Sequence, residues 1–121
     1  MFSVIFPGQG SQTVGMAKEL YSKYELVKKL FKSADQILDF PISKIILEGP
    51  SEELNLTENT QPAIFLVGFS IFNLVKEKFG FDLNKAKFFA GHSVGEYTAL
   101  ASSGVISFED TIKLLKIRGN A

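Results

Sequence analysis

Apolar positions in the first half of the chain change their spacing from one segment to the next. Residues 2–6 (FSVIF) are apolar on both faces and rich in β-forming residues, which predicts a strand covered by helices on each side. From residue 17 to residue 38 the apolar positions recur in steps of three and four, which predicts one long helix or two helices joined near residues 21–25. Pro41 closes this segment, because the residue before a proline resists the α region. Residues 42–47 are expected to form a short helix or irregular structure before a turn at residues 49–50.

The most apolar stretch of the chain covers residues 62–75 (PAIFLVGFSIFNLV). It is too short to cross a bilayer, so it predicts a buried core helix. Pro62 suits the first helical position, with Thr60 or Asn59 as the cap. The helix is expected to run to residue 78 and to end before Gly80.

The last third of the chain contains a second strand and two further helices by the same reasoning. Residues 87–90 (KFFA) with their flanks predict the strand, residues 91–95 a tight turn and residues 96–103 a short helix that ends at Gly104. Ser107 and Asp110 have the spacing of a capping box for a last helix over residues 108–118.

About two strands and four or five helices place the chain in the α/β class. Strands separated by helices form a parallel pair joined by long crossovers. Sheets that are stable on their own usually need three or more strands. We therefore interpret residues 1–121 as the N-terminal segment of a single α/β domain with a parallel sheet that is incomplete here.

Charge and composition exclude several classes of function. The 13 basic and 13 acidic residues balance and form no basic run, which argues against nucleic acid as the partner. Without cysteine and with His92 as the only histidine, we expect no metal site. The N-terminus lacks the pattern of a signal peptide. A cytoplasmic protein without a membrane partner is the resulting expectation.

Residues 91–95 (GHSVG) form a G-x-S-x-G motif between a predicted strand and a predicted helix. This is the context of a nucleophile elbow, in which small flanking residues allow a strained turn that exposes the serine. Ser93 is then a candidate nucleophile, and the N–H of Val94 is directed toward a developing oxyanion. The alternative is a glycine-rich turn whose serine has no chemical role.

The glycines at positions 8, 10 and 15 follow the first predicted strand. Thr13 stands where a dinucleotide-binding loop needs its third glycine, and the chain has no Gly-Lys-Ser/Thr sequence. In serine acyl-transfer enzymes, however, a second loop supplies the other oxyanion-hole N–H. Gln9 is the candidate for that donor, and an ordinary glycine turn is the alternative.

Arg118 is the only arginine in a chain with 12 lysines. A guanidinium binds a carboxylate through two parallel hydrogen bonds, which an ammonium cannot do. Alternatively, Lys113, Lys116 and Arg118 form a basic helix C-terminus that complements the helix dipole. His92 adjoins Ser93, but neighbouring side chains at a strand end point in different directions, so we interpret it as a structural residue and not as a base.

Four segments together resemble the malonyl-CoA:acyl-carrier-protein transacylase family, which includes the acyltransferase domains of fatty acid and polyketide synthases. They are FPGQGSQ at the start, TQPA at 60–63, GHSVGEYTAL at 91–100 and IRG at 117–119, in the order of the family. The resemblance covers the chain from residue 2 to its end and implies the N-terminal part of an α/β-hydrolase-like acyltransferase domain.

The resemblance implies a role for each matching residue. Ser93 would accept malonyl from malonyl-CoA and pass it to the phosphopantetheine thiol of acyl carrier protein, with Gln9 and Val94 forming the oxyanion hole. Arg118 would bind the malonyl carboxylate, and Gln61 would lie near the substrate. The substrates are a coenzyme A thioester and acyl carrier protein in fatty acid biosynthesis, and no cofactor is implied.

The catalytic histidine and the smaller subdomain of the family lie downstream of the segment that this chain matches. We therefore expect residues 1–121 alone to be inactive, because a serine nucleophile without its general base loses most of its reactivity. Two alternatives remain. A serine esterase or thioesterase would use the same elbow with water as acceptor, and a non-catalytic module would bind a partner.

Overall fold

A computed structural model of the chain describes residues 3–6, 15, 18–78, 88–91, 101, 104 and 106–120. Two strands lie in this part, β1 (Ser3–Phe6) and β2 (Phe88–Gly91). Each lies within one residue of the range expected from the apolar pattern. The strands pair in parallel with Ser3 opposite Phe88 and Phe6 opposite Gly91, so their carboxyl ends meet at one edge.

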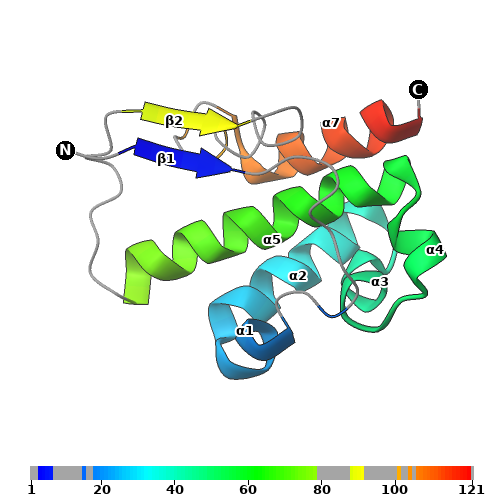
Figure 1. Cartoon of the computed structure of the whole chain (residues 1–121), viewed down its shortest axis with the longest axis horizontal. Helices are drawn as coiled ribbons and strands as arrows, with labels where there is room; N and C mark the ends of the chain where they lie inside the picture. Colours follow the sequence, from blue (N-terminus) through cyan, green and yellow to red (C-terminus); the bar gives the residue numbers. More distant parts are fainter. Residues whose placement is uncertain are drawn as a thin grey trace.

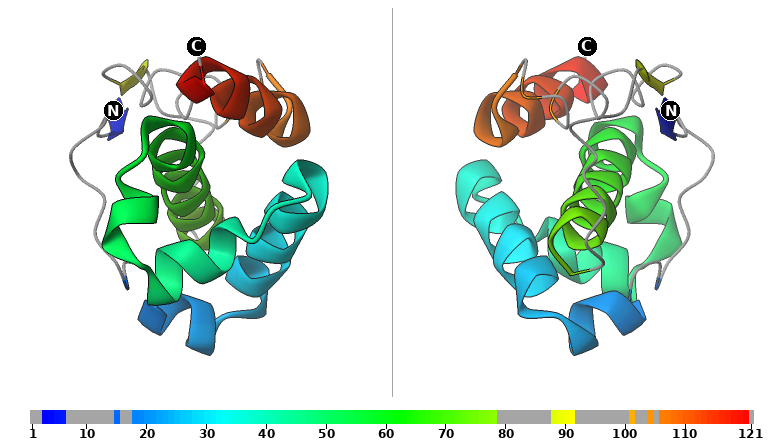
Figure 2. Two further views of the ribbon diagram at one scale, coloured as in Figure 1. Left: turned by 90° about the vertical axis from the view of Figure 1, so that its right-hand side faces the viewer. Right: turned by 90° about the vertical axis from the view of Figure 1, so that its left-hand side faces the viewer.

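The long helix α5 (Thr57–Lys78) lies at the centre of the molecule. The two strands and α7 (Phe108–Asn120) lie on one side of it, and the first four helices lie on the other, as Figures 1 and 2 show. Both strands point toward the end of the molecule where α5 begins and α7 ends (Figure 1). At about 1.5 Å per residue, α5 spans roughly 33 Å.

The amphipathic segment after β1 forms two helices, α1 (Lys18–Lys23) and α2 (Glu25–Leu38). Tyr24 interrupts them with an extended backbone, which resolves the choice between one helix and two. The buried residues of α2 are Val27, Phe31 and Ala34, spaced by four and three residues as the pattern predicted. The helix ends at Asp39, whose left-handed φ of 51° turns the chain toward Pro41.

Two short helices follow, α3 (Ile42–Glu48) and α4 (Ser51–Leu54). The sequence patterns predicted α3 as one of two possibilities and did not predict α4. Asp35 on α2 fixes the start of α3, because its carboxylate accepts hydrogen bonds from both the backbone N–H and the hydroxyl of Ser43. Gly15 lies against the other end of α3 and donates its N–H to the carbonyl of Ile46 at 2.7 Å.

The predicted start of the central helix at Pro62 is wrong, because α5 begins five residues earlier and encloses Pro62. Asn59 and Thr60 do not cap it: both are buried inside the helix and donate their backbone N–H groups to Leu56. Their side chains hydrogen-bond backward, from Asn59 to the carbonyl of Glu53 and from Thr60 to that of Leu54. Asn59 and Thr60 thus join α5 to the end of α4. Because these contacts satisfy their side chains, α5 can begin before Pro62.

The prediction of a buried core helix is confirmed for α5, where four consecutive residues from Ala63 to Leu66 are at most 5% exposed. Phe65 contacts Phe69 and Phe108 with ring centroids 5.4 and 5.6 Å apart, which packs the start of α7 against the middle of α5. The remaining described core side chains come from α2, α3, α4, α5 and α7, together with Ala101: Val27, Phe31, Ala34, Ile42, Ile45, Ile46, Leu54, Leu74, Ala101, Ile112 and Leu115.

The start of the last helix follows the predicted cap. Ser107 accepts the N–H of Asp110 on its hydroxyl at 3.1 Å, which confirms it as the cap of α7. Gly104 has a φ of 87° and donates its N–H to the carbonyl of Ala101. The short helix predicted over residues 96–103 lies outside the described residues apart from Ala101. The last helix is two residues longer than expected, because it continues through Gly119 to Asn120.

Candidate active site

The two segments that carry the predicted chemistry begin at the carboxyl edge of the strand pair. Phe6, opposite Gly91, is the residue before the PGQG segment, and Gly91 is the first glycine of the G-x-S-x-G motif. The parallel register therefore makes both segments leave the same edge from neighbouring positions. In parallel α/β sheets this edge is where ligands bind.

Three predicted site residues, Gln9, Ser93 and Val94, lie outside the described residues. The turn at residues 91–95 and His92 lie outside them as well, apart from Gly91 at the end of β2. Their roles stay predictions from the sequence.

Arg118 and Gln61 belong to the two helices that pack most extensively against each other. Arg118 lies in the last turn of α7, and its side chain is outside what the structure describes. Gln61 lies near the start of α5, where its side chain is 5% exposed. The start of α5 and the end of α7 lie at the same end of the molecule, which Figure 1 shows and a contact between Asn59 and Lys116 fixes.

That contact is a hydrogen bond of 2.7 Å from the ammonium of Lys116 to Oδ1 of Asn59. The same ammonium lies 4.0 Å from the ring centroid of Phe40, within the range of a cation–π interaction. Asn59 is 2% exposed and donates its amide to the carbonyl of Glu53 at 2.8 Å. Four segments of the fold therefore meet around one charged group.

Burial lowers the pKa of Lys116 below its ordinary value of 10.5, and the nearby charges of Glu58 and Glu53 oppose part of this shift. Partial loss of water disfavours an ammonium, whereas neighbouring carboxylates favour it. The hydrogen bond to Asn59 and the ring of Phe40 replace part of the lost hydration.

The interpretation of Lys116 as a residue that complements the helix dipole is wrong. Because α7 continues to Asn120, Lys116 lies before the last turn of the helix. The effect of the helix dipole is largely confined to that last turn. Lys113 also precedes the last turn and pairs on the surface with Glu109 at 3.2 Å. The sequence did not predict the contact between Lys116 and Asn59, because the two residues are 57 positions apart. Asn59 was instead predicted to be a helix cap.

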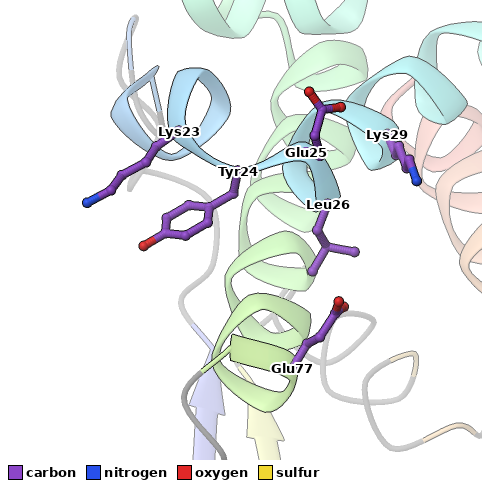
Figure 3. Close-up of a pocket in the computed structure, with 6 residues that line it drawn as sticks. All are labelled: Lys23, Tyr24, Glu25, Leu26, Lys29 and Glu77. Carbon is purple, nitrogen blue, oxygen red and sulfur yellow. The ribbon is translucent and has the colours of Figure 1, made fainter.

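A shallow surface depression of about 560 Å³ lies at the opposite end of α5. Figure 3 shows its lining residues, which come from the junction of α1 and α2 and from the end of α5: Lys23, Tyr24, Glu25, Leu26, Lys29 and Glu77. Glu77 follows Gln61 by 16 residues on the same helix, which corresponds to about 24 Å along its axis. This depression therefore lies away from the start of α5, where Gln61 lies.

Among the described residues, no three potential metal-ligating side chains cluster together, and no helix has the length and hydropathy of a membrane span.

Comparison with known proteins identifies the family of the chain. The profile of the acyl transferase domain matches residues 3–121. The malonyl CoA-acyl carrier protein transacylase of Haemophilus influenzae is 46% identical over 118 residues, which are 98% of this chain and 37% of that protein. The chain thus spans little more than a third of this curated relative.

Solved structures agree with this assignment. The acyl-carrier-protein-S-malonyltransferase of Bartonella henselae superposes with a TM-score of 0.92 at 41% identity, covering 99% of this chain and 38% of that one. A second match, with a TM-score of 0.88 at 39% identity, is a malonyl-transacylase in complex with a type II polyketide synthase acyl-carrier protein; it covers 98% of this chain and 38% of that one. The architecture is therefore that of these acyltransferases over the matched third. The chain belongs to the acyl transferase domain family.

Proposed function

We propose that this chain carries the nucleophile, the oxyanion hole and the carboxylate anchor of a malonyl-CoA:acyl-carrier-protein transacylase of fatty acid synthesis. Residues 1–121 would form the N-terminal segment of one acyltransferase domain with an α/β-hydrolase-like parallel sheet. The names of the relatives support malonyl-CoA as donor and acyl carrier protein as acceptor. The proposal requires no cofactor, and a cytoplasmic location stays a prediction.

The observation that carries the proposal is the register of the strand pair. With Phe6 opposite Gly91, the PGQG segment and the serine motif start next to each other at one sheet edge. An oxyanion hole needs two N–H donors from different segments that converge on one atom. Gln9 is three residues beyond Phe6 and Val94 is three residues beyond Gly91, so the two proposed donors follow the strand pair at the same distance along the sequence.

The proposed reaction has two transfers. The hydroxyl oxygen of Ser93 attacks the thioester carbonyl of malonyl-CoA, the C–S bond breaks, and coenzyme A leaves with the proton of the serine. The phosphopantetheine thiol of acyl carrier protein then attacks the malonyl-serine ester, and its proton returns to Ser93. The N–H groups of Gln9 and Val94 stabilise the negative oxygen of both tetrahedral intermediates.

Arg118 would select the acyl group in this scheme. Its guanidinium would bind the free carboxylate of malonate through two hydrogen bonds, a geometry that distinguishes malonyl from neutral acyl groups. Gln61 would lie beside the acyl group, near the start of α5. Both transfers need a general base, and we interpret His92 as a residue of the turn that does not fill this role.

The test is intact-mass spectrometry of the full-length protein after incubation with malonyl-CoA. We expect one malonyl adduct, located by peptide mapping on Ser93 and absent from Ser93→Ala. Ser22→Ala is the matched control, because Ser22 is an exposed serine whose hydroxyl contacts only backbone carbonyls of α1 among the described residues, and it should not change the adduct. A wild-type protein without an adduct, or with an adduct elsewhere, would refute the proposed nucleophile.

Loading of different acyl groups separates the transacylase from an esterase or thioesterase. Arg118→Ala should reduce loading from malonyl-CoA roughly ten- to a hundredfold while sparing a short neutral acyl-CoA, since a charge-assisted bidentate contact contributes about 1.5–3 kcal/mol. Addition of acyl carrier protein should then discharge the malonyl-serine of the wild type. Equal loss with both donors, or discharge to water alone, would favour the hydrolase.

A further inference from the structure

Lys116 and Lys113 lie three residues apart on α7, but their ammonium groups have different contacts and different exposure. The ammonium of Lys113 is at the surface, where its side chain is 52% exposed and pairs with Glu109 one turn away on the same helix. The ammonium of Lys116 leaves its own helix and reaches Asn59 on α5 and the ring of Phe40. Only Lys116 makes a contact between elements.

The Lys116 contact continues into a chain of interactions. Asn59 accepts the hydrogen bond from Lys116 on its side-chain oxygen, and its amide group donates a hydrogen bond to the carbonyl of Glu53, near the end of α4. Phe40 belongs to the connection between α2 and α3, so that connection is fixed against the same ammonium. Lys116 therefore ties α7 to three segments that are separated in sequence.

Few other described contacts hold this end of α7. Leu115 is fully buried and is the last core residue of the helix among the side chains that the structure describes. Of the side chains that the structure describes after Leu115, Ile117 is 67% exposed, and Lys116 alone contacts other elements. Arg118 follows Lys116 by two residues, within a single turn of about 3.6 residues.

We infer that Lys116 is a positioning residue, which holds the last turns of α7 against the start of α5 and thereby places Arg118 for the malonyl carboxylate. The inference rests on the proposed function for its second half. Because a bidentate contact depends on the orientation of the guanidinium, a small rotation of the last turn would weaken it. Lys116 itself does not touch the substrate.

Lys116→Met provides the test, since methionine retains an unbranched apolar side chain next to Phe40 and removes the donor to Asn59. In the full-length protein we expect the malonyl-CoA concentration for half-maximal loading of Ser93 to rise roughly ten- to a hundredfold. The loading rate at saturation and loading from a neutral acyl-CoA should change little. Lys116→Arg should recover most of the loss, and Lys113→Met should behave as the wild type.

A combination with Arg118→Ala distinguishes positioning from a general loss of structure. If Lys116 acts through Arg118, Lys116→Met will add no further loss of malonyl loading in the Arg118→Ala background. Additive losses, or equal losses for malonyl and neutral acyl groups, would overturn the inference.

Hydrogen exchange gives a readout that does not depend on malonyl transfer. Backbone amides of residues 116–120 should exchange roughly tenfold faster in Lys116→Met than in Lys113→Met, because one charge-assisted hydrogen bond has been lost. Equal protection in the two variants would overturn the inference even with an active enzyme. Failure of the wild type to form malonyl-Ser93 would instead refute the proposed function, and the exchange result would still decide whether Lys116 holds the helix.

Discussion

Replacement of Asn59 by alanine should destabilise the protein more than the same change at Asn73. The side chain makes two hydrogen bonds in a site that is 2% exposed, one to the carbonyl of Glu53 at 2.8 Å and one from the ammonium of Lys116 at 2.7 Å. A neutral hydrogen bond contributes about 1 kcal/mol and one to a charged group about 1.5–3 kcal/mol. We expect Asn59→Ala to lower the free energy of unfolding by about 2–4 kcal/mol.

Asn73→Ala is the matched control, because Asn73 lies on the same helix and its amide donates one hydrogen bond, to the carbonyl of Phe69 at 2.8 Å. Alanine raises helix propensity equally at both positions, by about 0.5 kcal/mol, so this gain cancels in the comparison. The two variants should therefore differ by about 1.5–3 kcal/mol, mostly from the bond to Lys116.

The assay is urea unfolding of the full-length protein followed by circular dichroism. Equal slopes with denaturant are required, since only then does a shift of the midpoint report stability. A loss at Asn59 no larger than the loss at Asn73 would show that the contact with Lys116 contributes nothing. In a double-mutant cycle, Asn59→Ala and Lys116→Met should be strongly non-additive, because both remove the same bond.

Three further predictions concern the core, a helix cap and pH. Phe65→Ala should cost about 3–5 kcal/mol in thermal or urea unfolding, because it empties a fully buried ring site between two helices, whereas Ile117→Ala at a 67% exposed position should cost less than about 0.5 kcal/mol. Ser107→Ala should cost about 1 kcal/mol by removing the cap of α7, and Ser107→Asp should restore it; equal stability of all three proteins would contradict the cap. Burial lowers the pKa of Lys116, so its charge opposes folding below the lowered pKa, and this penalty fades as the pH rises toward 10.5. Wild-type stability relative to Lys116→Met should therefore increase with pH in that alkaline window, and a decrease would contradict the assigned cause.

Local patterns predicted those parts of the fold whose causes are local. The spacing of Val27, Phe31 and Ala34 along α2 predicted which face is buried, since a helix of 3.6 residues per turn places these residues together. Ser107 was predicted as a cap because a hydroxyl three residues before an N–H can reach it without help from the rest of the chain.

The start of α5 could not be predicted in this way. Pro62 prefers the first turn of a helix, and the preceding residues TENT look like caps. Their polar groups are instead satisfied by carbonyls of α4, a helix whose existence the local pattern did not reveal. Once α4 supplies these acceptors, Asn59 and Thr60 can be buried within α5, and the tertiary contact outweighs the preference of proline.

In the candidate site, too, short motifs could be predicted from the sequence, whereas their arrangement in space could not. The elbow at residues 91–95 and the PGQG segment are short motifs, but only the register of β1 and β2 puts their starting points side by side.

The basic residues of α7 show the limit of local reasoning more sharply. Lys113, Lys116 and Arg118 look equivalent in the sequence, yet one forms a surface pair, one enters a contact between four segments and one occupies the last turn. The helix dipole acts on that last turn, so it remains an alternative for Arg118 and explains neither lysine. Arg118→Lys decides between the two roles: a dipole residue would tolerate a lysine without loss of malonyl loading, whereas a bidentate carboxylate anchor would lose most of it.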